Sequence, residues 1–181
     1  MAERESRSGE PPDLDAAAII SVFNRHRVRY VIIGAFAAIA QQAPIAATRD
    51  IDVTPAGGKA DLARLSAALT DLQARIRTDA VPGGLPFDHD AASLARADVW
   101  NLVCQFGEFD LTFHPSGFDG GYQELAVNAH RVRVGDVEVT VADLDDVIRS
   151  KEAAGRPKDI QALPALYRHR AARRRSSEPT D

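Results

Sequence analysis

The chain has 181 residues, of which 45% are hydrophobic, and it carries a formal net charge of −4 at pH 7. This length suits a single domain with one core, and the acidic balance argues against a protein coated in basic residues for gripping long nucleic acid. One cysteine and the lack of any stretch of 18 apolar residues exclude a disulfide framework, a cysteine-based zinc site and a membrane span, so a cytoplasmic protein is expected.

The N-terminal residues 1–13 combine charges with Ser, Gly and the pair Pro11–Pro12. Such a composition cannot bury enough apolar surface to fold, which predicts a disordered leader followed by an ordered domain over residues 14–170. The first helix is predicted from Asp15 to about Arg25, because its apolar residues fit one helical face.

A strand, a glycine and a helix are predicted next. Tyr30–Ile33 is rich in β-branched residues and predicts a buried strand, Gly34 ends it, and the alanine-rich stretch from Ala35 to Gln42 predicts a helix. A glycine at a strand end lets backbone N–H groups of the following helix approach a phosphate, where the helix dipole favours negative charge. Gly34 is therefore a candidate phosphate-binding position, although a lone glycine before a helix is more often only a turn.

A polar strand and a leucine-rich helix follow. Asp50–Thr54 alternates polar and apolar residues and stops at Pro55, which predicts a second strand. Four leucines at helical spacing predict a helix over Ala60–Arg77 that covers the sheet. Residues 79–97 show no clear period and are predicted to be a loop that can include a short turn of helix.

Two strand pairs are predicted in the second half of the chain. Val99–Phe106 and Phe109–Phe113 are predicted strands joined at Gly107–Glu108. Val132–Val134 and Val137–Val141 flank Gly135–Asp136, which predicts a hairpin with its turn at that dipeptide.

Two helices are predicted to end the domain. They cover Val141–Ala154 and Pro157 to about Arg170 and are separated by Gly155, and residues 171–181 are predicted to be a disordered basic and polar tail. Together these elements predict an α+β fold, in which a small mixed β-sheet is flanked by helices and followed by a helical C-terminal segment.

Three aspartates carry the candidate chemistry. Alternate side chains of a strand share a face, so Asp50 and Asp52 point to the same side. Like charges this close repel unless a cation compensates, and Mg²⁺ accepts carboxylate oxygens while keeping positions for phosphate and water. Asp110, on the polar face of a later strand, completes a three-carboxylate cluster if the two strands are neighbours. The pattern predicts a metal site, although an Asp-x-Asp on a half-exposed strand can also simply face solvent.

The order of these motifs resembles the signature of the nucleotidyltransferase superfamily with the polymerase-beta-like fold: a hydrophobic strand, Gly-Gly or Gly-Ser, a helix and Asp-x-Asp. Here Tyr30–Ala35 corresponds to the strand and turn, and Thr48–Asp52 to the carboxylates. Further on, Ser150–Asp159 resembles the lysine-containing helix end and the Arg-x-Lys-Asp segment of the minimal, AbiEii-like nucleotidyltransferases of toxin–antitoxin systems. The resemblance covers about residues 28–165.

This resemblance implies a nucleotidyltransferase fold and an enzyme that moves a nucleoside monophosphate from an NTP to an acceptor hydroxyl, with Mg²⁺ as its cofactor. It implies that Asp50, Asp52 and Asp110 bind the metal and act in catalysis. A cognate toxin or antitoxin partner is expected on the same ground.

The resemblance also implies a phosphate-binding side. Lys151 corresponds to the lysine that contacts the nucleotide phosphates, and Arg156 and Lys158 are further candidates for neutralising phosphate. Gly34 and Ala35 are candidates for holding phosphate with backbone donors. Basic residues at the end of a helix are equally explained as surface charges that compensate the helix dipole.

Three departures from the family pattern leave a second function open. Ala35 stands where a second Gly or Ser is usual, and Gln41–Gln42 and Ala46 stand where His-Gly and Arg are common. The alternative is a catalytically weak or inactive protein of this fold, acting as a nucleotide-binding, antitoxin-like or regulatory module. A plain α+β domain with surface aspartates is a third interpretation.

The acceptor is open between a tRNA end, a protein hydroxyl and an antibiotic. The only positive indication is a basic C-terminal region, which could attract RNA phosphates, although a charged terminal tail is more often merely solvated. Its residues are Arg168, Arg170, Arg173, Arg174 and Arg175.

Overall fold

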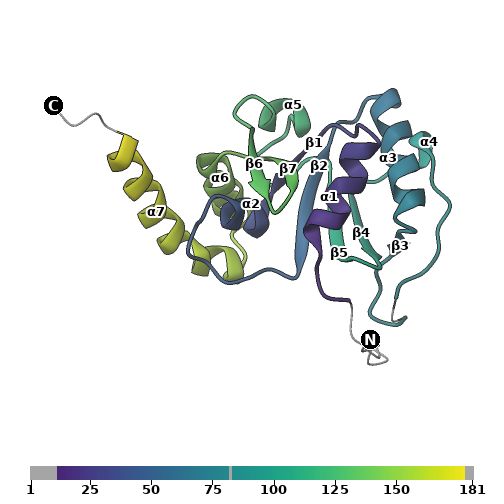
Figure 1. Cartoon of the computed structure of the whole chain (residues 1–181), viewed down its shortest axis with the longest axis horizontal. Coiled ribbons are helices and arrows are strands. Elements are labelled where there is room, and N and C mark those ends of the chain that lie inside the picture. The colour runs from purple at the N-terminus through teal and green to yellow at the C-terminus, as the bar shows by residue number, and fades with distance from the viewer. Residues whose placement is uncertain (1–11, 82, 178–181) are drawn as a thin grey trace.

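A computed structural model describes residues 12–81 and 83–177, so most of the predicted leader, residues 1–11, lies outside the described residues. The described chain has an α+β fold built around a seven-stranded mixed sheet (Figure 1). The strands lie in the order β3-β4-β5-β2-β1-β7-β6. In chain order they are β1 (Tyr30–Ile33), β2 (Asp50–Pro55), β3 (Arg75–Ile76), β4 (Val99–Cys104), β5 (Gly107–Thr112), β6 (His130–Val134) and β7 (Val137–Val141).

Two parallel pairings make the sheet mixed. β2 runs parallel to β5, and β1 runs parallel to β7, whereas the other neighbouring strands are antiparallel. β1 is buried along its whole length, as expected for an apolar strand covered on both faces. The strand order places β2 between β5 and β1, in the middle of the described sheet.

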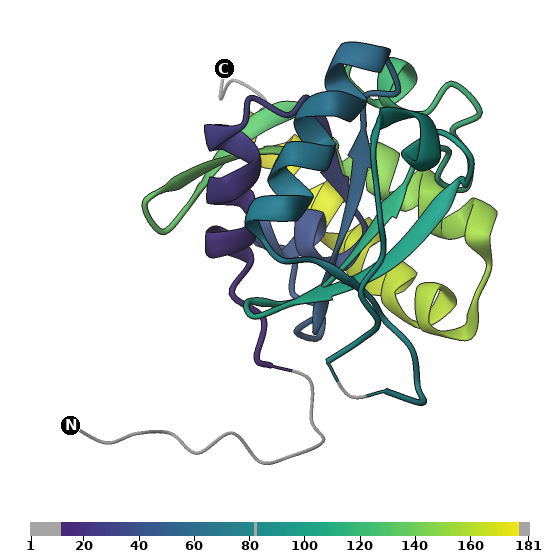
Figure 2. The ribbon, with the colours of Figure 1, turned by 90° about the vertical axis from the view of Figure 1, so that its right-hand side faces the viewer.

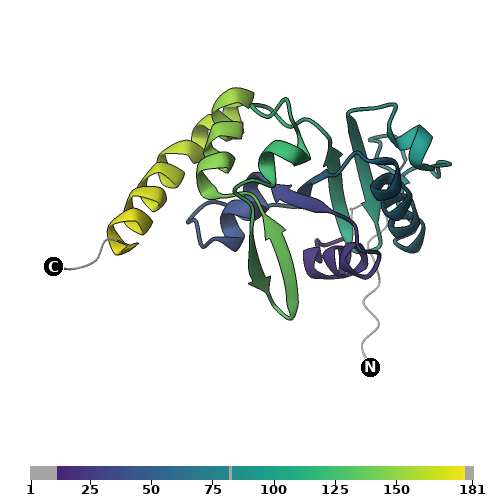
Figure 3. The same cartoon turned by 90° about the horizontal axis from the view of Figure 1, so that it is seen from above.

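Helices cover both faces of this sheet (Figure 2). α1 (Ala16–Arg25) and α3 (Lys59–Asp71) lie on one face, with the short α4 (Ala91–Leu94) beside α3. On the other face lie α2 (Gly34–Ala40), α6 (Leu144–Ala154) and α7 (Pro157–Ser177), and the short α5 (Tyr122–Leu125) precedes β6. Figure 3 shows the C-terminal part of α7 projecting away from the sheet. Within the described ranges, none of the helices has the length and apolar character needed to cross a membrane.

Alternation along β2 and β5 separates the core from the opposite face. Ile51, Val53, Phe109 and Leu111 are fully buried toward α1 and α3, and the Phe109 ring meets Phe23 of α1 edge-on with 6.0 Å between centroids. Each such side chain stabilises the fold by roughly 1.5–3 kcal/mol. The intervening residues, which include the predicted carboxylates, consequently face α2 and α6.

The helix predicted over Ala60–Arg77 is too long and ends at Asp71. Leu72 still packs in the core, but Gln73 has a φ of 51°, a left-handed conformation that cannot continue the helix. The chain then enters β3, which pairs with β4. The leucine spacing runs to Leu72, and a two-residue strand carries no alternation, so the sequence pattern concealed this change. Arg77 therefore follows a strand.

The turn between β4 and β5 lies earlier than predicted. Cys104 pairs with Gly107, so Gln105 and Phe106 form the turn and Gly107 begins the second strand. Gly107 has a φ of 115°, and a β-carbon there would lie 2.8 Å from the α-carbon of Leu14. A glycine is thus required at the first residue of β5, where a side chain would collide with Leu14, and not within the turn.

Two other loop predictions are confirmed. The hairpin at Gly135–Asp136 is closed by the pairing of Val134 with Val137. Among its described residues, the loop predicted over residues 79–97 contains only the short α4, apart from a bridge between Ile76 and Leu85.

The C-terminal helix is longer than predicted. α7 continues to Ser177, so residues 171–177, predicted to be part of a disordered tail, are helical. Arg170 and Arg174 both pair with Asp145 of α6, which ties successive turns of α7 to the domain. This contact between distant segments is invisible in local composition. Residues 178–181 lie outside the described residues.

Candidate active site

Four carboxylates form a block on the face of the sheet that carries α2 and α6. In the parallel pairing of β2 with β5, Asp50 is in register with Glu108 and Asp52 with Asp110. Residues in register on neighbouring strands direct their side chains to the same face. The strand adjacency required for Asp110 to join the Asp-x-Asp pair is therefore confirmed, and Glu108 lies beside them as a fourth carboxylate.

The electrostatics of this block favour a cation. The pKa of Asp52 is raised to about 6, mainly by burial and also by the negative charges of Asp50 and Asp110, against the opposing charges of Lys158 and Arg156. Burial also raises the pKa of Asp110, against the opposing charge of Arg77. The raised pKa values show that the ionised forms of these two adjacent carboxylates are not fully stabilised by nearby positive charge. A bound metal ion would supply that charge.

Two neighbours position the carboxylates of β2. Gly34 has a φ of 75°, and a β-carbon at this position would lie 2.1 Å from Asp52 Oδ2, so only glycine fits between the end of β1 and this carboxylate. The Thr48 hydroxyl donates a hydrogen bond to Asp50 Oδ1 over 2.9 Å. α2 begins at Gly34 without a side-chain cap, which leaves the first backbone N–H groups of the helix without a capping partner.

A buried carboxylate organises the basic side of the site. Asp159 of α7 is fully buried and accepts hydrogen bonds from Lys151 Nζ at 2.9 Å and from Arg156 Nε at 2.6 Å. Burial alone would raise the pKa of Asp159, but the hydrogen bonds and charges of Arg156 and Lys151 lower it. Lys151 is itself buried, so the predicted phosphate-contacting lysine is held inside the protein by Asp159.

One cavity of about 510 Å³ joins the acidic and basic sides. This volume is within the range of small-molecule sites. All the predicted site residues line the cavity: Gly34, Ala35, Asp50, Asp52, Asp110, Lys151, Arg156 and Lys158. Carboxylates from β2 and β5 and cations from α6 and α7 thus meet around a single space, although they come from distant parts of the chain.

The oxygen donors of this cavity fit a hard divalent cation such as Mg²⁺. Within residues 12–81 and 83–177, however, no three His, Cys, Asp or Glu side chains are close enough as they stand to enclose a metal ion. Two of the carboxylates already have a cationic partner, because the guanidinium of Arg77 donates to Asp110 Oδ1 and to Glu108 Oε2, each over 2.9 Å. Asp50 and Asp52 remain the better-placed ligands, and metal binding itself stays a prediction.

Four residues of the site were missed by sequence reasoning. Glu108 lies two residues before Asp110 on the same strand, so strand alternation predicts that the two side chains share a face. Asp159 lies within the Arg-x-Lys-Asp segment, where the resemblance points to the basic residues instead. Thr48 and Arg77 contact the carboxylates through a loop and through sheet pairing, and local pattern carries no signal for either.

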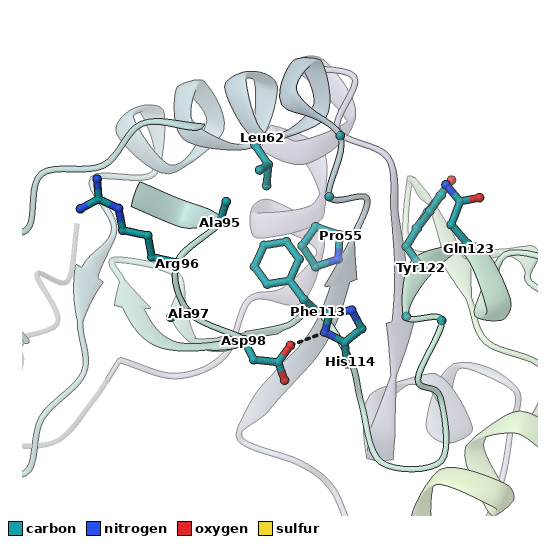
Figure 4. Close-up of a pocket in the computed structure, with 14 residues that line it drawn as sticks. Pro55, Leu62, Ala95, Arg96, Ala97, Asp98, Phe113, His114, Tyr122 and Gln123 are labelled. Carbon is teal, nitrogen blue, oxygen red and sulfur yellow. Dashed lines mark hydrogen bonds and ion pairs between the residues drawn. The ribbon is translucent and has the colours of Figure 1, made fainter. Parts of the chain in front are cut away.

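A second cavity, of about 730 Å³, lies at the opposite end of β2 (Figure 4). Pro55, Leu62 and Phe113 line it, and His114 Nδ1 lies there 2.5 Å from Asp98 Oδ1. It contains none of the predicted site residues and no comparable opposition of carboxylates and cations. We therefore place the candidate active site in the smaller cavity.

No protein-family model matches the chain, and a search of curated proteins finds no match. Among solved structures, the fold is similar to that of a Thermotoga maritima protein proposed to be a nucleotidyltransferase, with a TM-score of 0.51 and 12% identity over 84% of this chain and 91% of that chain. The antibiotic-resistance factor ANT(2″)-Ia gives a TM-score of 0.49 and 13% identity over 82% of this chain and 78% of that chain. The first likeness supports the nucleotidyltransferase fold. Identity this low relates folds, and activity has to be argued from the site.

Proposed function

We propose that the protein is a Mg²⁺-dependent nucleotidyltransferase that moves an NMP from an NTP to a hydroxyl group of an acceptor, either a tRNA or a protein. The observation that carries this proposal is the register of Asp52 with Asp110, on one wall of a cavity whose other walls present Arg156 and Lys158. A triphosphate requires both a carboxylate-held metal and side-chain cations around its phosphates.

The residues would divide the chemistry as follows. Asp50 and Asp52 would hold Mg²⁺, which when bound neutralises the charge that develops on the transferred phosphoryl group. The acceptor oxygen bonds to the α-phosphorus, the bond from that phosphorus to pyrophosphate breaks, and the hydroxyl proton passes to a carboxylate oxygen of Asp110. The raised pKa of Asp110 suits a proton acceptor.

The basic side would bind the departing pyrophosphate. Lys158 and Arg156 line the cavity and supply positive charge there. Asp159 fixes the orientation of Arg156 and of the buried Lys151 through the hydrogen bonds that it accepts from both. Two cations held on one carboxylate keep a net positive charge that is already positioned before the nucleotide arrives.

A transfer assay with labelled NTP and Mg²⁺ tests the proposal. We expect the wild type to transfer NMP, and Asp52→Asn to lose at least about 100-fold in rate, as for the removal of a group that stabilises developing charge. The control is Asp136→Asn, a fully exposed aspartate in the β6–β7 turn, which should transfer normally. Transfer that persists in Asp52→Asn contradicts the assigned site.

A second candidate function is a nucleotide-binding, antitoxin-like or regulatory module of the same fold without catalysis. It is favoured by Ala35, which offers no hydroxyl to phosphate, and by the engagement of Asp110 with Arg77. NTP would then raise the thermal midpoint of the wild type without transfer to any acceptor. For either function we propose a cytoplasmic location and a toxin or antitoxin partner, because Ser150–Asp159 resembles that branch.

A further inference from the structure

Arg77 lies at the end of a row of polar residues that crosses the sheet at the level of Asp52. Its backbone N–H donates to the carbonyl of Asn101 over 2.9 Å, which extends the β3–β4 pairing by one residue. Asn101 pairs with Asp110, and Asp110 pairs with Asp52. Residues in register on adjacent strands share a face, so this row directs all four side chains to the cavity side of the sheet.

The guanidinium of Arg77 bridges two carboxylates of β5. One nitrogen donates to Asp110 Oδ1 and the other to Glu108 Oε2. The side chains are only 25%, 17% and 23% exposed for Arg77, Asp110 and Glu108, so both ion pairs are partly shielded from solvent. Partly buried, charge-assisted bonds of this kind are stronger than pairs between exposed side chains.

This contact conflicts with a metal site that includes Asp110. The guanidinium occupies Asp110 Oδ1, and a divalent cation on Asp50 and Asp52 would bring a like charge close to it. Glu108 lies one step further along β5 and is in register with Asp50. It gives Arg77 a second carboxylate to which the guanidinium can stay bound when it leaves Asp110.

We propose that Arg77 is the resident counter-ion of Asp110, and that Asp110 reaches a divalent cation held by Asp50 and Asp52 only by exchanging Arg77 for it, while Arg77 stays on Glu108. This inference rests on the metal site of the proposed function, and it does not depend on transfer to any acceptor. Arg77 thereby sets how tightly the site takes up metal.

Mn²⁺ binding to the full chain without nucleotide, measured by electron paramagnetic resonance, tests the exchange. We expect Arg77→Ala to lower the Mn²⁺ dissociation constant about tenfold, since the competing charged hydrogen bond is gone. Arg77→Lys keeps the positive charge but loses the two-nitrogen guanidinium group that contacts both carboxylates. Its Mn²⁺ dissociation constant should lie between those of the wild type and Arg77→Ala. Arg133→Ala is the charge-matched control, because Arg133 is exposed on the edge strand β6 and does not line the cavity, and it should change the constant by no more than about twofold.

Three results would overturn the proposal: equal tightening in Arg133→Ala and Arg77→Ala, unchanged or weaker binding in Arg77→Ala, or no Mn²⁺ binding by either the wild type or Arg77→Ala. Circular dichroism establishes that each variant is folded, and Arg77→Lys carries the test if Arg77→Ala is not. Exchange observed without nucleotide transfer would reject the proposed function and leave this inference standing.

Discussion

The α-carbon of Gly34 rests against the carboxylate of Asp52. The two residues meet because Ile33, the last residue of β1, pairs with Asp52 on β2. A glycine at this turn is usually explained by the approach of a phosphate to the backbone. Here it is also required by the aspartate, since any side chain at position 34 would occupy the space of Asp52 Oδ2.

Replacing Gly34 tests this contact. Gly34→Ala should lower the free energy of unfolding by at least about 1–2 kcal/mol from its left-handed backbone alone, and it should also displace Asp52 and abolish Mn²⁺ binding. Urea unfolding and Mn²⁺ titration measure the two effects. Gly57→Ala is the control, because a β-carbon at Gly57 meets nothing within 4 Å. Equal stability and equal Mn²⁺ binding in the two variants would show that Gly34 is not required.

Asp52 makes the metal-free protein less stable as the pH rises. The pKa of an aspartate is about 3.9 in an unfolded chain, and that of Asp52 is raised to about 6 by burial, so the folded protein holds this proton more tightly. The contribution of this proton to the free energy of unfolding is complete below about pH 4 and is lost as the pH rises through about 6.

Asp52→Asn removes this dependence. In the presence of EDTA, the variant should gain roughly 1 kcal/mol or more in unfolding free energy relative to the wild type between about pH 5 and about pH 7.5. Urea unfolding at the two pH values measures the gain. Asp136→Asn, at a fully exposed position, should show none. A constant difference between Asp52→Asn and the wild type would mean that the pKa of Asp52 is not raised.

The buried pair of Lys151 and Asp159 should be costly to break. Asp159→Asn leaves the Lys151 ammonium buried without its carboxylate, and the free energy of unfolding should fall by about 3–5 kcal/mol. Asp145→Asn, which removes the exposed partner of Arg170 and Arg174, should cost less than about 1 kcal/mol. Urea unfolding of both variants makes the comparison.

A double variant separates the charge from the packing. Lys151→Met with Asp159→Leu should recover part of the stability lost in Asp159→Asn, because no buried charge is left unpaired. If Asp159→Asn lowers the free energy of unfolding no more than Asp145→Asn does, the role given to the buried carboxylate is wrong.

The parts of the site that were predicted from the sequence depend on short-range rules. Strand alternation placed Asp50 and Asp52 on one face, and a glycine between a strand and a helix marked the turn at Gly34. Alternation also placed Asp110 on the polar face of its strand, whereas the roles of Lys151, Arg156 and Lys158 rested on resemblance. The structure brings all of these residues to the same cavity.

The missed parts depend on contacts between distant segments. Arg77 reaches Asp110 only because β3 adds to the edge of β4, and the leucine spacing before it indicated a helix instead. The last turns of α7 are tied to Asp145, a contact that the arginine-rich composition does not reveal. In both cases tertiary pairing decided a local structure that the sequence pattern left ambiguous.

The parallel pairing of β2 with β5 has a consequence for how the protein folds. β1 with β2, and β4 with β5, join segments that are close in the chain, so either pair can nucleate early. Bringing β2 beside β5 requires closure of the whole segment that contains α3, β3 and β4. The two carboxylates of β2 therefore meet the two of β5 only when this long segment closes, and repulsion between the two pairs does not oppose the local pairings. Metal binding by a refolding chain would then serve as a kinetic marker for the completion of the sheet.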